Sequence, residues 1–124
     1  VLAILAEFMG AISVDAIELD SKVYENSIYN GKLNNCSKIN FIKGSGVSIK
    51  KNKYDYILVN INLNSILEEF KFYASAMEKK SIIILSGFYK SDMSSIQEKG
   101  RGYGLKYLNS ESLNEWTTLT MKKI

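Results

Sequence analysis

The stretch YDYILVNINLNSILEEFKFYASAMEKKSIIILS, residues 54–86, decides the fold class of this 124-residue chain. Its two runs of Ile, Leu and Val predict β-strands at 54–60 and 81–86 that are buried on both faces. Between them, apolar residues recur at helical spacing, which predicts a helix that Asn64 or Ser65 caps and that ends near Met77. A strand, a helix and a second strand in this order indicate a parallel pair joined by a crossover helix.

The segments before residue 54 continue the same alternation. We expect a buried, all-apolar helix over residues 1–9 that stops at Gly10, and then a strand over 12–17. Asp20 or Ser21 is a suitable cap for a helix over 22–33, with Val23, Ile28 and Leu33 on its inner side. A strand over 39–43 closes at Gly44–Gly46, and residues 50–53 form a basic turn.

The segments after residue 86 predict a turn at Gly87, a helix over 92–99, a Gly-rich stretch over 100–104 and a terminal hairpin of 105–108 with 115–122. The whole pattern predicts an α/β fold. We expect a three-layer sandwich with a mostly parallel sheet and an antiparallel C-terminal edge, formed by a single domain over residues 1–124.

Composition narrows the possible functions. Hydrophobic residues make up 46% of the chain and charged residues 23%, which is typical of a globular domain and not of a disordered one. The net charge of +3 and the spread of lysines indicate a solvated surface, so no direct contact with nucleic acid is expected. No apolar run approaches the ~20 residues of a membrane span, so no membrane contact is expected either.

Residue types that are rare or missing exclude further classes of site. The sequence contains no His, which excludes His-based catalytic triads and zinc sites with His ligands. The single cysteine, Cys36, cannot form an internal disulfide and is not expected to act as a nucleophile. A reduced, cytoplasmic setting is therefore the expected location.

Polar residues stand where three of the predicted strands end: Glu18, Ser45 after Gly44, and Asn60. Ligands of open parallel sheets bind outside the carboxyl ends of the strands. A carboxylate at Glu18 can accept hydrogen bonds from two ribose hydroxyls, but an acidic residue after a strand serves equally well as a helix cap. Asn60 ends an apolar strand and needs hydrogen-bond partners, which either a turn or a ligand can supply.

Four segments carry a family resemblance: DAIELD (15–20), FIKGSG (41–46), KYDYILVNIN (53–62) and SIIILSGFY (81–89). In this order and spacing, together with the late Glu115–Trp116, the chain resembles class I S-adenosylmethionine-dependent methyltransferases over essentially all 124 residues. It is most similar to the bacterial ribosomal protein L11 methyltransferases. The resemblance implies a Rossmann-like fold, S-adenosyl-L-methionine as the cofactor, a ribosomal protein as the partner, and methyl transfer to a lysine or N-terminal amine.

The resemblance also implies roles for individual residues. Glu18 would hold the ribose hydroxyls, and Leu19 would lie near the adenine face. Ser45 stands at a position, often Asp in the family, near the adenine amino group. Asn60 would contact the methionine end of the cofactor and, as the catalytic residue, orient the incoming amine. No metal is implied.

In that family, a strand and a Gly-rich loop precede the helix with which this chain begins. We therefore expect an N-terminally truncated catalytic domain that has no measurable activity alone, and a gap or an unusual direct pairing between the strands that end at Glu18 and Asn60. Two alternatives are an NAD-binding fold, which also places an acidic residue after its second strand, and a nucleotide-binding Rossmann-like domain without activity. The Asn-Ile-Asn of residues 60–62 and the Leu-Ser-Gly of residues 85–87 favour the methyltransferase over the NAD-binding fold.

Overall fold

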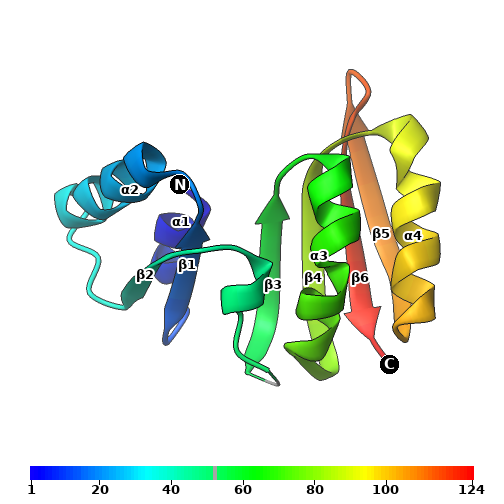
Figure 1. Cartoon of the computed structure of the whole chain (residues 1–124), viewed down its shortest axis with the longest axis horizontal. Helices are drawn as coiled ribbons and strands as arrows, with labels where there is room; N and C mark the ends of the chain where they lie inside the picture. Colours follow the sequence, from blue (N-terminus) through cyan, green and yellow to red (C-terminus); the bar gives the residue numbers. More distant parts are fainter. Residues whose placement is uncertain (52) are drawn as a thin grey trace. The chain divides into compact units, whose positions relative to one another are not determined.

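The computed structural model describes residues 1–51 and 53–124 of the chain. In chain order the elements are α1 (Leu2–Phe8), β1 (Val14–Glu18), α2 (Ser21–Leu33), β2 (Ile39–Lys43), η1 (Gly46–Ser48), β3 (Tyr54–Asn60), α3 (Leu63–Ser75), β4 (Met77–Tyr89), η2 (Lys90–Asp92), α4 (Met93–Gly102), β5 (Leu105–Leu113) and β6 (Trp116–Lys123) (Figure 1). The basic turn expected at 50–53 contains Asn52, which lies outside the described residues.

The chain divides into two compact units, residues 1–48 and 49–124. Each contains one pair of parallel strands, β1 with β2 and β3 with β4, so the predicted α/β alternation is confirmed. The expected single domain over residues 1–124 stays a prediction. β1 and β3 belong to different sheets, so the direct pairing that we gave as one expectation does not form between the described residues.

In the first unit, a side-chain cap and a close glycine contact position α2. The Asp20 Oδ1 atom accepts hydrogen bonds from the backbone N–H groups of Lys22 and Val23, at 2.9 and 3.0 Å, which confirms the predicted cap. A Cβ atom at Gly31 would lie 2.8 Å from the Phe41 ring, so only glycine lets α2 approach β2 this closely. Gly10, with φ +104°, ends α1 as predicted.

The apolar side chains of the first unit stay largely exposed. The expected burial of the first helix is wrong, because α1 has no buried residue and Phe8 is 64% exposed. Of the three residues that we expected on the inner side of α2, Val23 and Leu33 are exposed as well, whereas Ile28 is half-buried. Two strands of five residues each offer too little sheet surface to cover the apolar faces of two helices.

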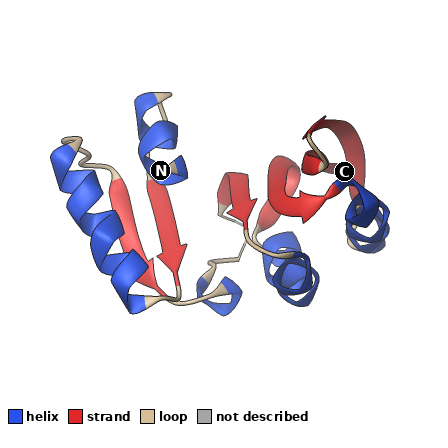
Figure 2. Ribbon diagram, turned by 90° about the horizontal axis from the view of Figure 1, so that it is seen from above, coloured by secondary structure: helices blue, strands red, loops and turns tan. Residues whose placement is uncertain are grey.

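In the second unit, four strands pair in the order β3-β4-β6-β5. β6 runs antiparallel to both β4 and β5, which confirms the predicted antiparallel C-terminal edge. Asn114 and Glu115 both have positive φ angles and form the two-residue turn between β5 and β6. Both α3 and α4 lie on the same face of this sheet (Figure 2). None of the helices in the described ranges has the length and hydropathy that a bilayer crossing requires.

The core of the second unit lies between that sheet and its two helices. The largest side chains that are fully buried there, at 0–1% exposure, are Ile66, Phe70, Ile83, Leu85, Phe88, Ile96, Leu105, Leu119 and Met121. The predicted apolar face of α3 is therefore confirmed. The cap predicted at Asn64 or Ser65 is wrong: α3 begins at Leu63, and the Asn62 Oδ1 atom caps it by accepting a hydrogen bond from the Ser65 N–H at 2.9 Å.

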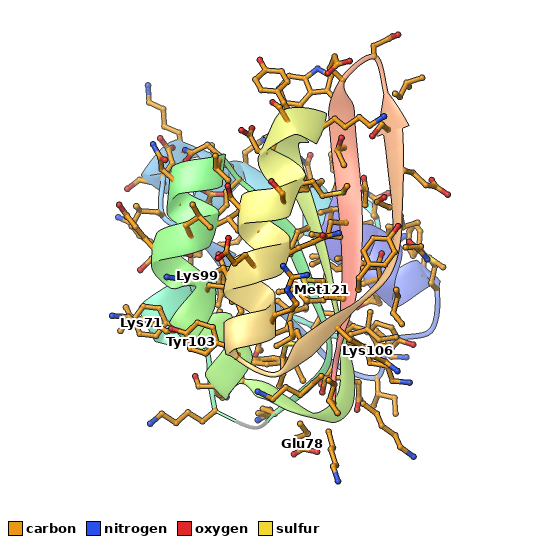
Figure 3. The ribbon with its side chains drawn as sticks, turned by 90° about the vertical axis from the view of Figure 1, so that its right-hand side faces the viewer. Lys71, Glu78, Lys99, Tyr103, Lys106 and Met121 are labelled. Carbon is orange, nitrogen blue, oxygen red and sulfur yellow. The ribbon has the colours of Figure 1, made fainter. Side chains whose placement is uncertain are left out.

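The C-terminal end of α4 differs from the sequence prediction. The helix continues to Gly102, through the first half of the stretch that we expected to be a Gly-rich loop. Gly100 explains the difference, since a Cβ atom there would lie 2.7 Å from the Met121 Sδ atom. The missing side chain lets α4 lie against β6, and Tyr103 then stacks on Phe70 with ring centroids 5.9 Å apart (Figure 3).

Candidate functional site

Glu18 and Ser45, two of the three residues expected near the nucleoside, come together at one edge of the first unit. Parallel pairing places Glu18 opposite Lys43, at the carboxyl ends of β1 and β2. The next residue, Gly44, donates its N–H to the Glu18 carbonyl oxygen at 3.0 Å. Ser45 follows directly, and its carbonyl oxygen accepts the Ser48 N–H at 2.8 Å, so the loop turns back at once.

The Glu18 side chain keeps hydrogen-bonding capacity for a ligand. Its Oε1 atom accepts one hydrogen bond, from the Asp20 N–H at 3.1 Å, whereas an ionised carboxylate can accept about four. Asp20 itself, and not Glu18, caps α2. Glu18 therefore makes a local turn contact and does not cap the helix. Its second carboxylate oxygen, Oε2, can accept hydrogen bonds from hydroxyl groups.

Leu19 adds an apolar surface next to this carboxylate. It is 69% exposed, and nothing in the first unit covers it among the described residues. An exposed leucine beside a carboxylate and a serine hydroxyl is chemically suited to a nucleoside, which has a flat apolar base and a diol. The residues present therefore fit the adenosine part of the cofactor that the resemblance implies.

Asn60, the predicted catalytic residue, lies in the second unit at the carboxyl end of β3. It pairs with Ser86 of β4 and is exposed. Water can satisfy its amide there, so the argument that Asn60 needs hydrogen-bond partners from a turn or a ligand does not apply. Asn60 and Ser86 line an open hollow of about 570 Å³, a size typical of small-molecule sites.

A β-bulge shapes this hollow. The register between β4 and β6 shifts between Leu85 and Phe88, and Gly87 in the shifted segment has φ +97°. A Cβ atom at Gly87 would lie 2.3 Å from the Ile61 carbonyl oxygen, so glycine is required for β4 to pass this close to the turn after β3. Bulges of this kind are over-represented next to active sites.

The β5–β6 hairpin contributes side chains to the hollow that our list of site residues missed. Glu111, Leu113 and Trp116 line it together with Asn60. The Glu115–Trp116 pair was part of the family resemblance and could have pointed to Trp116. Nothing in the sequence could have pointed to Glu111, because its place depends on the pairing of β5 with β6.

The other chemically reactive side chains give no sign of a second centre. Partial burial, together with the Glu7 carboxylate, raises the pKa of the Cys36 thiol, which disfavours the nucleophilic thiolate. Tyr73 donates a hydrogen bond to Glu69 at 2.8 Å within α3, and burial raises its pKa. Among the residues that the structure describes, no cluster of acidic or cysteine side chains could hold a metal ion.

Comparison with curated proteins yields close relatives. A ribosomal protein L11 methyltransferase from Phocaeicola vulgatus is 36% identical over 120 residues, and one from Bacteroides fragilis is 32% identical over 120 residues. Each match covers 96% of this chain and 43% of the relative, so the chain spans less than half the length of these relatives.

Comparison with solved structures gives the same fold. A ribosomal protein L11 methylase from Lactobacillus delbrueckii subsp. bulgaricus has a TM-score of 0.92 at 23% identity, covering 99% of this chain and 65% of that one. The expected Rossmann-like methyltransferase fold is therefore confirmed. The family model described as ribosomal protein L11 methyltransferase (PrmA) matches residues 1–124, and this chain belongs to that family.

Proposed function

We propose that this chain provides cofactor-binding and substrate-orienting residues for S-adenosylmethionine-dependent methylation of amino groups on ribosomal protein L11. The observation that carries the proposal is the family match over residues 1–124, joined to the polar strand ends at Glu18 and Asn60. When bound, the cofactor supplies a methyl group on a reactive sulfonium. The protein then has mainly to bind, orient and exclude competing reactions.

Each residue has a distinct part in this proposal. The Glu18 carboxylate accepts hydrogen bonds from the two ribose hydroxyls, and Leu19 packs against the adenine ring. Ser45 offers one hydroxyl to the adenine amino group, without charge. The Asn60 side-chain oxygen orients the uncharged amine nitrogen of a lysine or N-terminus. A cytoplasmic location, where ribosomal proteins are made, belongs to the same proposal.

The cofactor part can be tested in a chimera. The matched 120-residue segment of the Bacteroides fragilis relative is replaced by this chain, and S-adenosylhomocysteine binding is measured by isothermal titration calorimetry. Replacing Glu18→Ala is expected to weaken binding by about 1.5–3 kcal/mol, since a charged hydrogen-bond partner is lost. Glu25→Ala, at an exposed position on α2, is the matched control and leaves the affinity unchanged.

The reaction itself is tested with the same chimera, ribosomal protein L11 and S-adenosylmethionine carrying a labelled methyl group. We expect transfer to L11 amino groups, and Asn60→Ala should lower kcat because the amine is no longer oriented. If the chimera binds S-adenosylhomocysteine but transfers no methyl group, the domain without activity becomes the better description. Equal binding by the wild-type chimera and the Glu18→Ala variant would show that Glu18 does not bind the cofactor and serves only in its turn contact with Asp20.

A further inference from the structure

The hollow beside Asn60 has a chemical character of its own. Asn60, Ser86 and Gly87 line it from the carboxyl ends of β3 and β4. The hairpin lines it with Glu111, Leu113 and Trp116, which we call the wall, and with the hydroxyl residues Ser112, Thr117 and Thr118. The wall thus offers one carboxylate, one aromatic ring and one leucine that is 75% exposed. A ligand that matches all three has a positive charge and a flexible apolar stem.

Contacts within the hairpin hold this wall in place. Tyr89 stacks on Trp116 with ring centroids 4.7 Å apart and an interplanar angle of 28°, which fixes the plane of the indole. The Ser112 and Thr117 hydroxyls form a hydrogen bond of 2.8 Å across the two strands. Glu111 lies directly opposite Thr118 in the same ladder. The carboxylate and the indole are therefore presented from paired, regular strands.

Charge is unevenly distributed over the second unit. Residues 49–124 contain eleven lysines and one arginine against eight acidic residues. At the end of the sheet away from the hairpin turn, Lys106 even lies directly opposite Lys122 (Figure 3). The lining of the hollow reverses this balance, because Glu111 is its only charged residue among those described. A cation is accommodated here and an anion is disfavoured.

We infer that Glu111 is a specificity-determining residue that holds the ammonium group of a substrate lysine, whose methylene stem lies along Trp116 and Leu113. The inference rests on the proposed function and assigns the amine-binding wall to the hollow in which Asn60 stands. A carboxylate binds an ammonium by a charge-assisted hydrogen bond, and an indole face adds a cation–π contact. Glu111 acts in binding the charged lysine as it arrives; the ammonium then loses its proton to solvent, and the neutral amine is the form that the Asn60 oxygen orients.

The chain carries its own reporter for this test, since Trp116 is its single tryptophan. The probes are Nα-acetyl-lysine methylamide and the norleucine compound that has the same stem without the ammonium group. We expect the lysine probe to change Trp116 fluorescence in a saturable way, and the norleucine probe to bind more weakly. In Glu111→Gln, lysine binding falls by about 3- to 5-fold, the size of one solvent-accessible ion pair, and norleucine binding stays the same.

Two controls keep the result specific. Glu98→Gln, at an exposed position on α4, leaves both titrations unchanged, and Glu111→Lys weakens lysine binding further than Glu111→Gln. Unaltered thermal unfolding of the variants shows that the fold is retained. No saturable response to the lysine probe, or equal responses of wild type and Glu111→Gln, would overturn the inference. Since the titration needs neither cofactor nor methyl transfer, it can succeed or fail independently of the proposed reaction.

Discussion

The two units of this chain alternate strands and helices in the same way, yet they bury their side chains to very different extents. In the second unit, Phe70 and Leu119 are completely buried between four strands and two helices. In the first unit, only Gly31 and Gly46 are buried, and Phe8 stays 64% exposed beside a two-stranded sheet. Helical or strand periodicity therefore determines which element forms, whereas burial requires enough neighbouring sheet to cover the apolar face.

The largest expected effect comes from matched phenylalanine truncations in the two units. Phe70→Ala removes a ring that contacts Tyr73 and Tyr103, and should lower the free energy of unfolding by about 3–5 kcal/mol. Phe8→Ala, at an exposed position on α1, should change it by less than about 0.5 kcal/mol. Urea unfolding followed by circular dichroism measures both. Similar losses would show that α1 is buried in solution, and the contrast between the units would disappear.

Alanine substitutions at two glycines with positive φ angles compare the energetic cost of backbone strain alone with that of strain and steric overlap together. Gly87→Ala in the second unit should cost about 1–3 kcal/mol, because its Cβ atom would also meet the Ile61 carbonyl oxygen. Gly10→Ala in the first unit should cost about 1 kcal/mol, since its φ is +104° but no atom lies within 4 Å. Thermal unfolding of the two variants compares them directly. A larger loss at Gly10 would contradict the close approach of β4 to the turn after β3.

The helix caps should have nearly equal effects in the two units. Asp20→Ala removes the acceptor of two N–H groups of α2, and Asn62→Ala removes the acceptor of one in α3. Each should destabilise its own helix by about 1 kcal/mol. Amide hydrogen exchange, read separately for residues 21–33 and 63–75, is the measurement. A loss of protection that spreads from Asp20 into α3 would mean that the units unfold together.

The smallest effect at neutral pH concerns Tyr73. Burial and the bond to Glu69 raise its pKa, so the folded state keeps the phenol neutral after an unfolded tyrosine, at pH ~10, has begun to ionise. The unfolded state then binds fewer protons, and stability falls as the pH rises above 10. Tyr73→Phe should flatten this alkaline fall in a urea titration from pH 8 to 11. An unchanged slope would assign the fall to other groups.

Much of the candidate site could be predicted from the sequence. Where a predicted strand ends in a polar residue, the strand itself determines that this residue lies at its carboxyl end. Glu18 and Ser45 come together because β1 and β2 are parallel and in register, which the strand–helix–strand pattern already indicates. Asn60 lies at the end of β3 for the same reason. The hairpin wall could not be predicted from the sequence, since Glu111 lines the hollow only because β5 and β6 pair in the antiparallel register that places it opposite Thr118.

The sequence by itself determined the order and type of the elements, a cap at Asp20 or Ser21 and the apolar face of α3. These depend on local spacing and on hydrogen bonds between residues that are a few positions apart. Tertiary structure alone decided that α4 continues through Gly100 and that α1 stays exposed. The first depends on the close approach of α4 to Met121, which leaves room only for glycine at position 100, and the second on the extent of a neighbouring sheet. Both are set by atoms distant in the chain, so local patterns do not determine them.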